Sequence, residues 1–192
     1  MKKNLSIYTD KELVSMMQGD RRSSEAAFTE IYDRYSVRLN AYCRTILNNR
    51  ALAEDVFQET LMKFYQNVRH DFSGSIIGYL ITIARNLCLN QKRDARPTVP
   101  LEDFDFPTNE HTQYEDKEMA DIVMMSLELL DPVSKEVMVL RTFNDLPYEE
   151  IAEILTITSA RARYLAFNAK NKIRQIIAEY SKESVIQKSE NN

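Results

Sequence analysis

The stretch LPYEEIAEILTITSARARYLAFNAKNKIRQI, residues 146–176, decides the expected fold because it contains two helical patterns separated by only a few residues. In the first pattern, Ile151, Ile154 and Leu155 recur at helical spacing and are expected to face inward. A three-residue turn, TIT, follows and supplies Thr158 as an N-cap for the second helix. Two helices joined in this way are typical of a helix-turn-helix unit, whose second helix enters the major groove of DNA.

The second helix has two different faces when its residues are projected at the helical period. Ala162, Ala166, Ala169 and Ile173 fall on the inner face, where small alanines permit close packing of helices. The outer face presents Ala160, Arg161, Arg163, Tyr164, Phe167, Asn168 and Asn171, followed by Lys170, Lys172 and Arg174. Arginine can read guanine, asparagine can read adenine, and lysine suits phosphates. A solvated basic surface is the alternative, and the two aromatic residues fit either thymine methyl groups or a protein interface.

Composition predicts an all-α protein. The 192 residues include only three glycines and five prolines, 44% of them are hydrophobic, and the apolar residues recur at helical spacing. Four helices are expected before residue 95: Leu5 to Met17, a long helix that contains Phe28 to Ile46, residues 51–68, and residues 75–93. Later helices are expected over Asp121 to Leu130, after the Asp131-Pro132 pair, and over the two patterns of residues 146–176.

The charges are divided unevenly along the chain. Residues 1–100 carry 15 basic and 11 acidic side chains, residues 101–131 carry 1 and 10, and residues 132–192 carry 9 and 8. The net charge of −4 therefore comes from the middle segment, whereas residues 1–100 and 132–192 each carry more basic than acidic side chains. An excess of basic side chains suits the binding of nucleic acid. The segment 95–118 contains three prolines and no helical period for most of its length, which predicts an acidic flexible linker between two small helical domains.

Several classes of protein are disfavoured by the sequence. Cys43 and Cys88 lie within apolar helical patterns and are expected to be reduced core residues. His70 and His111 lack a nucleophile or metal-ligand partner at a usable spacing, so we expect no catalytic residue, no metal and no cofactor. No window approaches the 18 or more apolar residues of a membrane span, so we expect no membrane insertion and a cytoplasmic location.

Four blocks together resemble the extracytoplasmic-function (ECF) sigma factors, the small two-domain members of the sigma-70 family that direct bacterial RNA polymerase to promoters. The blocks are ELVSMMQGD…EAAFTEIYDRY, AEDVFQETLMKFY, GYLITIARNLCLNQKR and LDPVSKEVMVLRTFNDLPYEEIAEIL. They occur in the order of the family and cover most of residues 10–177, with the linker in the expected place. The resemblance implies a factor that binds core RNA polymerase and directs promoter-specific initiation, with no enzymatic activity of its own.

The resemblance also implies which residues make each contact. Core RNA polymerase is expected to bind Asp55, Gln58, Glu59 and Lys63. Recognition and opening of the minus-10 promoter element are expected to involve Phe72, Ser73, Gly74, Ser75, Tyr79, Arg85, Asn86, Lys92 and Arg93. The minus-35 element is expected to be read as duplex by Ser159, Ala160, Arg161, Arg163, Tyr164, Phe167, Asn168, Lys170, Asn171 and Arg174.

The implied domains are sigma region 2 over residues 1–95, the acidic linker over 96–118, sigma region 4 over 119–180, and a polar tail over 181–192. The implied partners are core RNA polymerase, promoter DNA and an anti-sigma factor, with the free protein monomeric. In the second helix of the helix-turn-helix the chain departs from the family, which commonly has a glycine in the turn, Thr-Val at the helix start and several arginines. This chain has Thr156, Arg161-Ala162, Leu165 and Asn168 at those positions.

Two other hypotheses remain open at this point. A free-standing helix-turn-helix regulator would bind paired half-sites as a dimer, with the N-terminal helices serving dimerisation or ligand binding. A helical adaptor would use the basic helix to bind an acidic protein. The first alternative gives no reason for the basic end of the fourth helix or for the acidic linker.

Overall fold

The computed structural model describes residues 5–68, 72, 74–94 and 114–190, with Asp94, 114–118 and 181–190 described by their backbone alone. The described residues form helices joined by short connections and contain no strand. The all-α prediction is therefore confirmed. Two compact units, residues 1–102 and 103–192, divide the chain. Each unit has its own buried core and is described separately below.

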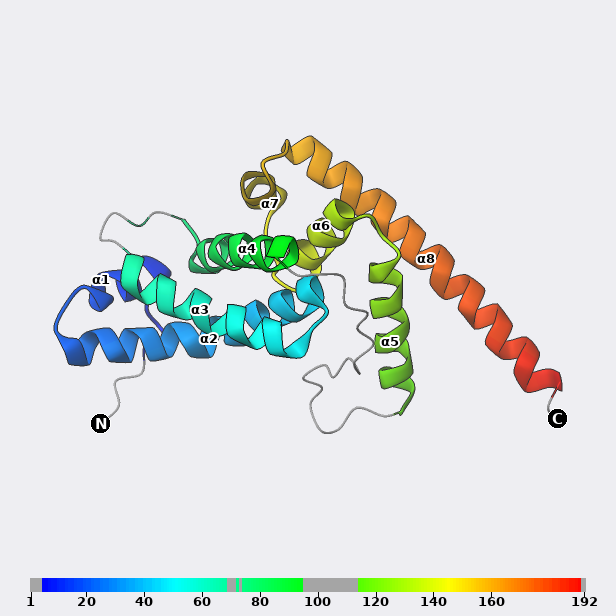
Figure 1. The fold of residues 1–192 in the computed structure, drawn as a ribbon, viewed down its shortest axis with the longest axis horizontal. Coiled ribbons are helices and arrows are strands. Elements are labelled where there is room, and N and C mark those ends of the chain that lie inside the picture. Colours follow the sequence, from blue (N-terminus) through cyan, green and yellow to red (C-terminus); the bar gives the residue numbers. More distant parts are fainter. Residues whose placement is uncertain (1–4, 69–71, 73, 95–113, 191–192) are drawn as a thin grey trace. The chain divides into compact units, whose positions relative to one another are not determined.

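The first unit contains α1 (Asp10–Met17), α2 (Arg21–Leu47), α3 (Arg50–Asn67) and α4 (Ile76–Asp94) (Figure 1). Helix α2 packs against the other three helices, and α4 also packs against α3. The fully buried side chains at the centre come from all four helices and include Leu13, Leu39, Phe64 and Leu80. Periodic burial of apolar side chains therefore explains the bundle.

The first helix is shorter than the sequence pattern predicts. Thr9 Oγ1 accepts from the Glu12 backbone N–H at 3.4 Å, and Glu12 Oε2 accepts from the Thr9 backbone N–H at 2.7 Å. This reciprocal capping box fixes the start of α1 at Asp10 rather than at Leu5. Leu5 is nevertheless buried, and its carbonyl oxygen accepts from Arg34 Nη2 at 3.0 Å.

The second unit contains α5 (Tyr114–Glu128), α6 (Pro132–Thr142), α7 (Tyr148–Leu155) and α8 (Ser159–Glu190). Helices α5, α6 and α7 all pack against α8, so α8 is the central helix of this unit (Figure 1). Met124, Leu127 and Leu130 are buried in one cluster with Ala169 and Ile173 of α8.

Helix limits in the second unit follow local chemistry. Asp131 accepts from the Ser134 backbone N–H at 3.0 Å, and Pro132 occupies the first turn of α6, as the Asp-Pro pair predicts. The cap lowers the pKa of Asp131 through the Ser134 side chain and backbone. Helix α5 begins at Tyr114, seven residues before the predicted start at Asp121. Helix α8 continues to Glu190, into the segment predicted as a polar tail.

Most of the predicted linker, 96–118, lies outside the described residues. His70, His111 and Ser73 lie outside them as well. None of the eight described helices combines the length and the apolar character needed to cross a bilayer.

Candidate functional site

The exposed side of α3 carries the residues expected to bind polymerase. Asp55, Gln58 and Glu59 are exposed, and Lys63 is half-buried. Lys63 Nζ lies 3.2 Å from Glu59 Oε1, and Gln58 Nε2 donates to Glu54 Oε1 at 2.9 Å. These pairs join neighbouring turns of one helix and hold the polar side chains along its surface.

An apolar residue lies within this polar surface. Met62 is 60% exposed, although Leu61 and Phe64 on the same helix are buried in the core. A solvated surface helix gains nothing from an exposed methionine, whereas protein interfaces are enriched in this residue. The outer side of α3 therefore combines one exposed apolar side chain with charged and amide side chains.

The start of α4 is fixed by two side chains. Ser75 Oγ accepts from the Gly78 backbone N–H at 2.9 Å, and Asp10 Oδ2 accepts from the Ile76 backbone N–H at 3.1 Å. Gly74 precedes them with φ 121°, a conformation that side chains disfavour, and it is exposed. A glycine turn followed by two caps therefore sets where the preceding loop joins the helix.

Asp10 connects three helices at this point. Its Oδ1 accepts from the Tyr35 hydroxyl at 2.6 Å and lies 3.7 Å from Arg34 Nη1, while its Oδ2 reaches α4. Burial and this hydrogen bond raise the pKa of Tyr35 to about 12. The sequence prediction did not include Asp10, because its contact with Ile76 joins residues far apart in the chain.

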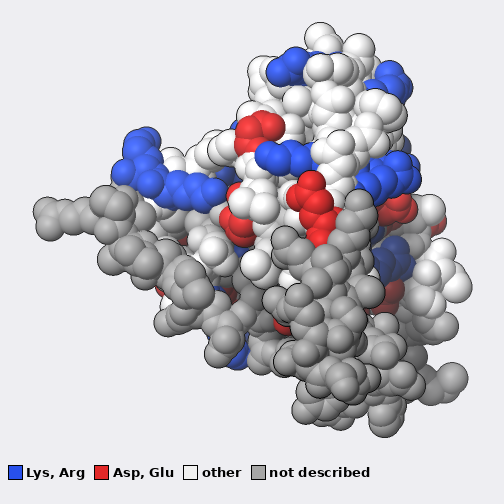
Figure 2. Space-filling model, turned by 90° about the vertical axis from the view of Figure 1, so that its right-hand side faces the viewer, with Lys and Arg blue, Asp and Glu red and all other residues white. Residues whose placement is uncertain are grey.

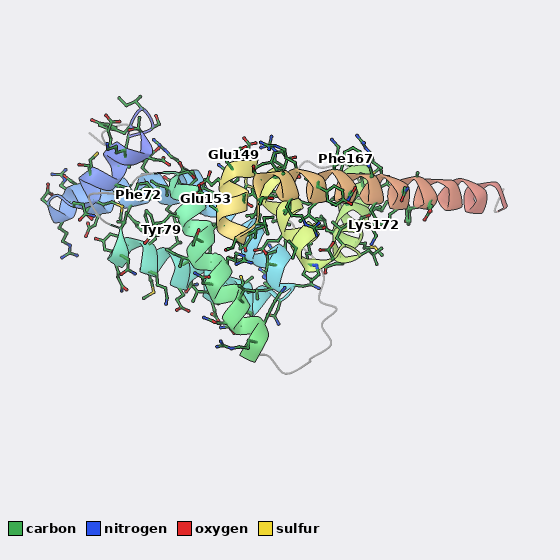
Figure 3. The ribbon with its side chains drawn as sticks, turned by 90° about the horizontal axis from the view of Figure 1, so that it is seen from above. Phe72, Tyr79, Glu149, Glu153, Phe167 and Lys172 are labelled. Atoms are coloured by element: carbon green, nitrogen blue, oxygen red, sulfur yellow. The ribbon has the colours of Figure 1, made fainter. Side chains whose placement is uncertain are left out.

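Aromatic side chains meet beside the start of α4. The rings of Phe72 and Phe64 each lie 5.9 Å from the ring of Tyr79, measured between centroids, with interplanar angles of 54° and 60°. Phe64 is fully buried, whereas Phe72 and Tyr79 are half-buried. Figure 3 shows Phe72 and Tyr79 near each other in the first unit. Tyr79 therefore contacts a core phenylalanine and a half-buried phenylalanine.

Beyond this cluster, α4 presents a stripe of polar and basic residues. Asn86, Lys92 and Arg93 are exposed and Arg85 is half-buried, and at 3.6 residues per turn they fall on one side of the helix. Leu89, in the same stripe, is 47% exposed. A basic stripe that begins near an aromatic cluster matches the combination that binds single-stranded nucleic acid.

The helix-turn-helix is formed by α7 and α8, as the sequence predicts. Thr156 ends α7 in the left-handed conformation, with φ 56° and ψ 46°. The Ile157 backbone N–H then donates to the Ala152 carbonyl oxygen at 3.0 Å, and Thr158 Oγ1 accepts from the Arg161 backbone N–H at 3.1 Å. The predicted cap on α8 is therefore confirmed.

The two faces of α8 agree with the projection. Ala162, Ala166, Ala169 and Ile173 are buried, and so is Leu165. The predicted outer residues that the structure exposes are Ala160, Arg161, Arg163, Tyr164, Phe167, Asn168, Lys170, Lys172 and Arg174, while Ser159 and Asn171 are half-buried.

Two outer residues have partners within the unit. Arg163 Nη2 donates to Glu149 Oε1, and its guanidinium lies 5.6 Å from the centroid of the Tyr148 ring. Lys172 Nζ donates to the Leu129 carbonyl oxygen at 2.5 Å, near the end of α5. Lys172 therefore has a structural contact that its position in the sequence did not predict.

Tyr148 also contacts a second arginine. Arg141 lies 5.3 Å from the centroid of the same ring, and its Nη1 donates to the Leu146 carbonyl oxygen at 3.0 Å. On the face of the molecule seen in Figure 2, Lys and Arg side chains lie in separate groups, with Asp, Glu and uncharged side chains between them.

The two cysteines lie in the core of the first unit. Cys43 and Cys88 are both fully buried and carry free thiols, as the sequence predicts. A hydrogen bond with Cys88 and burial raise the pKa of the Cys43 thiol far above its ordinary value. Over the part of the chain that the structure describes, no group of three or more His, Cys, Asp or Glu side chains is placed to hold a metal ion.

Comparisons with known proteins agree with the sequence prediction. A family profile for sigma-70 region 2 matches residues 31–98, and one for sigma-70 region 4 matches residues 120–173. RNA polymerase sigma factor CarQ of Myxococcus xanthus is 26% identical over 167 residues, which cover 85% of this chain and 96% of that protein. ECF RNA polymerase sigma factor SigW of Bacillus subtilis is 27% identical over 152 residues, covering 71% and 81%.

Two solved structures share the fold. CnrH, solved in complex with the cytosolic domain of CnrY, is similar with a TM-score of 0.65 and 21% identity, over 88% of this chain and 97% of that one. The sigma factor RpoE from Bartonella quintana, solved with the anti-sigma factor NepR, is similar with a TM-score of 0.62 and 18% identity, over 79% and 96%.

Proposed function

Because this chain is an ECF sigma factor of the sigma-70 family and directs RNA polymerase to promoters, we propose which of its surfaces make each contact. Helix α3 binds the core enzyme, the aromatic cluster and basic stripe at α4 hold the minus-10 element, and α8 reads the minus-35 element. The domains that we propose for these roles are sigma region 2 over residues 1–95 and sigma region 4 over residues 119–180, joined by a linker over 96–118 and followed by a tail over 181–192.

The polymerase contact is carried by the exposed side of α3. Asp55, Gln58 and Glu59 are exposed there around Met62, and Lys63 pairs with Glu59. An apolar residue surrounded by polar groups provides a contact that excludes water at its centre and keeps a polar rim. This exposed methionine within a polar stripe is the observation that carries the proposal.

The minus-10 contact is made by the start and the basic side of α4. Ser73, Gly74 and Ser75 precede the helix, and the ring of Phe72 lies 5.9 Å from the ring of Tyr79. An unstacked base can stack on Phe72, while Arg85, Asn86, Lys92 and Arg93 contact the sugar–phosphate chain. Melting of the duplex exposes the bases as well as the sugar–phosphate chain of one strand. The aromatic cluster and the basic residues can therefore bind the same strand.

The minus-35 contact is made by the outer side of α8. Arg161, Lys170 and Arg174 are exposed cations, and the first acid after Ser159 is Glu179. A helix without acidic residues over this length suits the polyanionic groove of duplex DNA. Ala160, Arg163, Tyr164, Phe167, Asn168 and Asn171 complete the outer side.

The protein acts in the bacterial cytoplasm as an initiation factor, and the polymerase supplies the phosphodiester chemistry. We propose that an anti-sigma factor holds it inactive, because RpoE, which shares its fold, was solved with such a partner. We propose that the free chain is monomeric.

The first test is binding to core RNA polymerase. Fluorescence anisotropy of the labelled protein, titrated with purified bacterial core enzyme, is expected to show tight, saturable binding. The variant Asp55→Ala, Gln58→Ala should bind about tenfold more weakly, since it removes two interface side chains. The matched control Thr29→Ala, Asp33→Ala removes one acid and one polar group from the exposed side of α2 and should bind as wild type.

Absence of core binding by the wild type would reject the sigma function and favour the free-standing regulator. In that case sedimentation should show a dimer, and footprinting should show protection of two half-sites. If the wild type binds core RNA polymerase and the α3 variant binds it equally well, only the assignment of this contact to α3 is rejected.

A further inference from the structure

The exposed side of α8 has an aromatic centre. At about 100° per residue, Ala160, Tyr164, Phe167 and Asn171 fall along the middle of the exposed side, and we call these four residues the central strip. Tyr164 is 57% and Phe167 65% exposed. When a helix lies in the major groove, the middle of its outer side faces the edges of the bases.

Cations border this strip on both edges. Arg161 lies along one edge, and Arg163 and Lys170 lie along the other. Arg161 is 5.7 Å from the centroid of the Tyr164 ring, and Arg163 is held by Glu149 and stacked on Tyr148. These positions suit contact with the two phosphate chains that border a groove, which leaves direct contact with the bases to the central strip.

We propose that the central strip reads A·T base pairs, through contact of Tyr164 and Phe167 with the 5-methyl groups of thymine in the upstream duplex element. This inference rests on the proposed function. The thymine methyl is the apolar group that a base pair presents in the major groove, and aromatic side chains can pack on it. Asn171 in the same strip suits the N6 and N7 groups of adenine, so both chemistries select the same base pair.

The surrounding charge favours DNA over a protein as the occupant of this face. The segment from Ser159 to Ala178 contains five basic residues and no acidic one. Across the turn, Glu149 pairs with Arg163, so Arg161 and Lys170 are the exposed cations that remain for the phosphates at the two edges. Phe167 lies on α8 (Figure 3), in the part of the helix whose sequence contains no acidic residue. The outer side of α8, with cations at its edges and an apolar centre, therefore matches a major groove that has phosphates at its edges and thymine methyl groups on its floor.

The test changes only the methyl groups of the DNA. Holoenzyme, assembled from the full chain and core RNA polymerase, is first used to select transcribed promoters from a randomised library by run-off transcription. Each thymine of the selected upstream element is then replaced by deoxyuridine, which removes one methyl and leaves base pairing intact. We expect about fourfold weaker holoenzyme binding for each contacted methyl, the effect of exposing one buried carbon.

Protein variants identify the contact. Holoenzyme that carries Phe167→Ala should bind the thymine-containing and the deoxyuridine-containing DNA equally well for at least one position, because the side chain that contacts the methyl group is absent. Lys170→Ala should weaken binding to both DNAs equally and keep the fourfold ratio, since a phosphate contact carries no base information. Met125→Ala, which removes another exposed apolar side chain of the unit, should behave as wild type.

Three results would overturn the inference. Wild-type holoenzyme that binds and transcribes equally with thymine and deoxyuridine would reject methyl reading and leave the sigma function intact. Loss of core binding in Phe167→Ala would assign the aromatic pair to a protein interface. Failure of the wild-type chain to bind core RNA polymerase at all would reject the proposed function as well.

Discussion

At the scale of single residues, Thr156 has the most unfavourable backbone conformation among the functional elements. It lies in the left-handed region, with φ 56°, where a β-branched residue is rare, and its side chain is exposed. A β-branched side chain in this conformation stores steric strain in the turn.

We predict that Thr156→Gly raises the free energy of unfolding of the second unit by about 1 kcal/mol, because glycine adopts this conformation without the steric cost. Urea denaturation followed by circular dichroism measures the change. Asn48→Gly is the matched control: Asn48 has φ 49° at the end of α2, but asparagine tolerates this region, so its replacement should have a smaller effect. A loss of stability in Thr156→Gly would show that the threonine is not strained.

At the scale of elements, the position of α4 depends on α1. Asp10 accepts hydrogen bonds from Tyr35 on α2 and from the Ile76 backbone N–H at the start of α4. That start also follows the Gly74 turn and lies beside the contact of Phe72 with Tyr79. Asp10 is thus a positioning residue for the surface that we propose to hold the minus-10 strand.

We predict that Asp10→Ala lowers the stability of the first unit by about 2 kcal/mol, since it removes hydrogen bonds to a charged group. Promoter opening, measured by permanganate reactivity of melted thymines, should slow more than core binding weakens. Asp10→Asn keeps an acceptor for Ile76 and should restore part of the opening rate. Glu12→Ala alters the cap of the same helix without touching α4, and should leave opening unchanged. Equal losses in core binding and opening would argue for a purely structural role.

At the scale of the whole molecule, the chain consists of two units, each with its own core. Most buried residues of the first come from α1 to α4, and most of those of the second come from α5 to α8. The residues between Asp94 and Tyr114 include three prolines and several acids. Separate cores joined by such a segment are expected to fold independently.

We predict that fragments 1–94 and 114–192 each fold, so that their circular dichroism spectra add up to the spectrum of the full chain. The fragment 1–94 should bind core RNA polymerase, since it contains the α3 surface. Thermal unfolding of the full chain should accordingly show two transitions. Fragments that are unfolded alone would show that each unit needs the other.

Local patterns were sufficient for most of the elements. The spacing of apolar residues predicted the inner face of α8, and the chemistry of Asp131 and Thr158 predicted two helix starts. Each of these features depends on residues within one or two turns of each other, which a sequence displays directly. The predicted start of α1 at Leu5 is wrong: the Thr9–Glu12 capping box begins the helix at Asp10, and Leu5 is buried without being helical.

The sequence by itself determined the all-α fold, the helix-turn-helix and the family, because helical periods, caps and motif order are properties of neighbouring residues. Only the tertiary structure decided how the side chains of the candidate surfaces are held. It paired Arg163 with Glu149, placed Tyr79 between Phe64 and Phe72, and joined Asp10 to Ile76. These contacts depend on how helices pack, and packing geometry is not written in the spacing along any one helix.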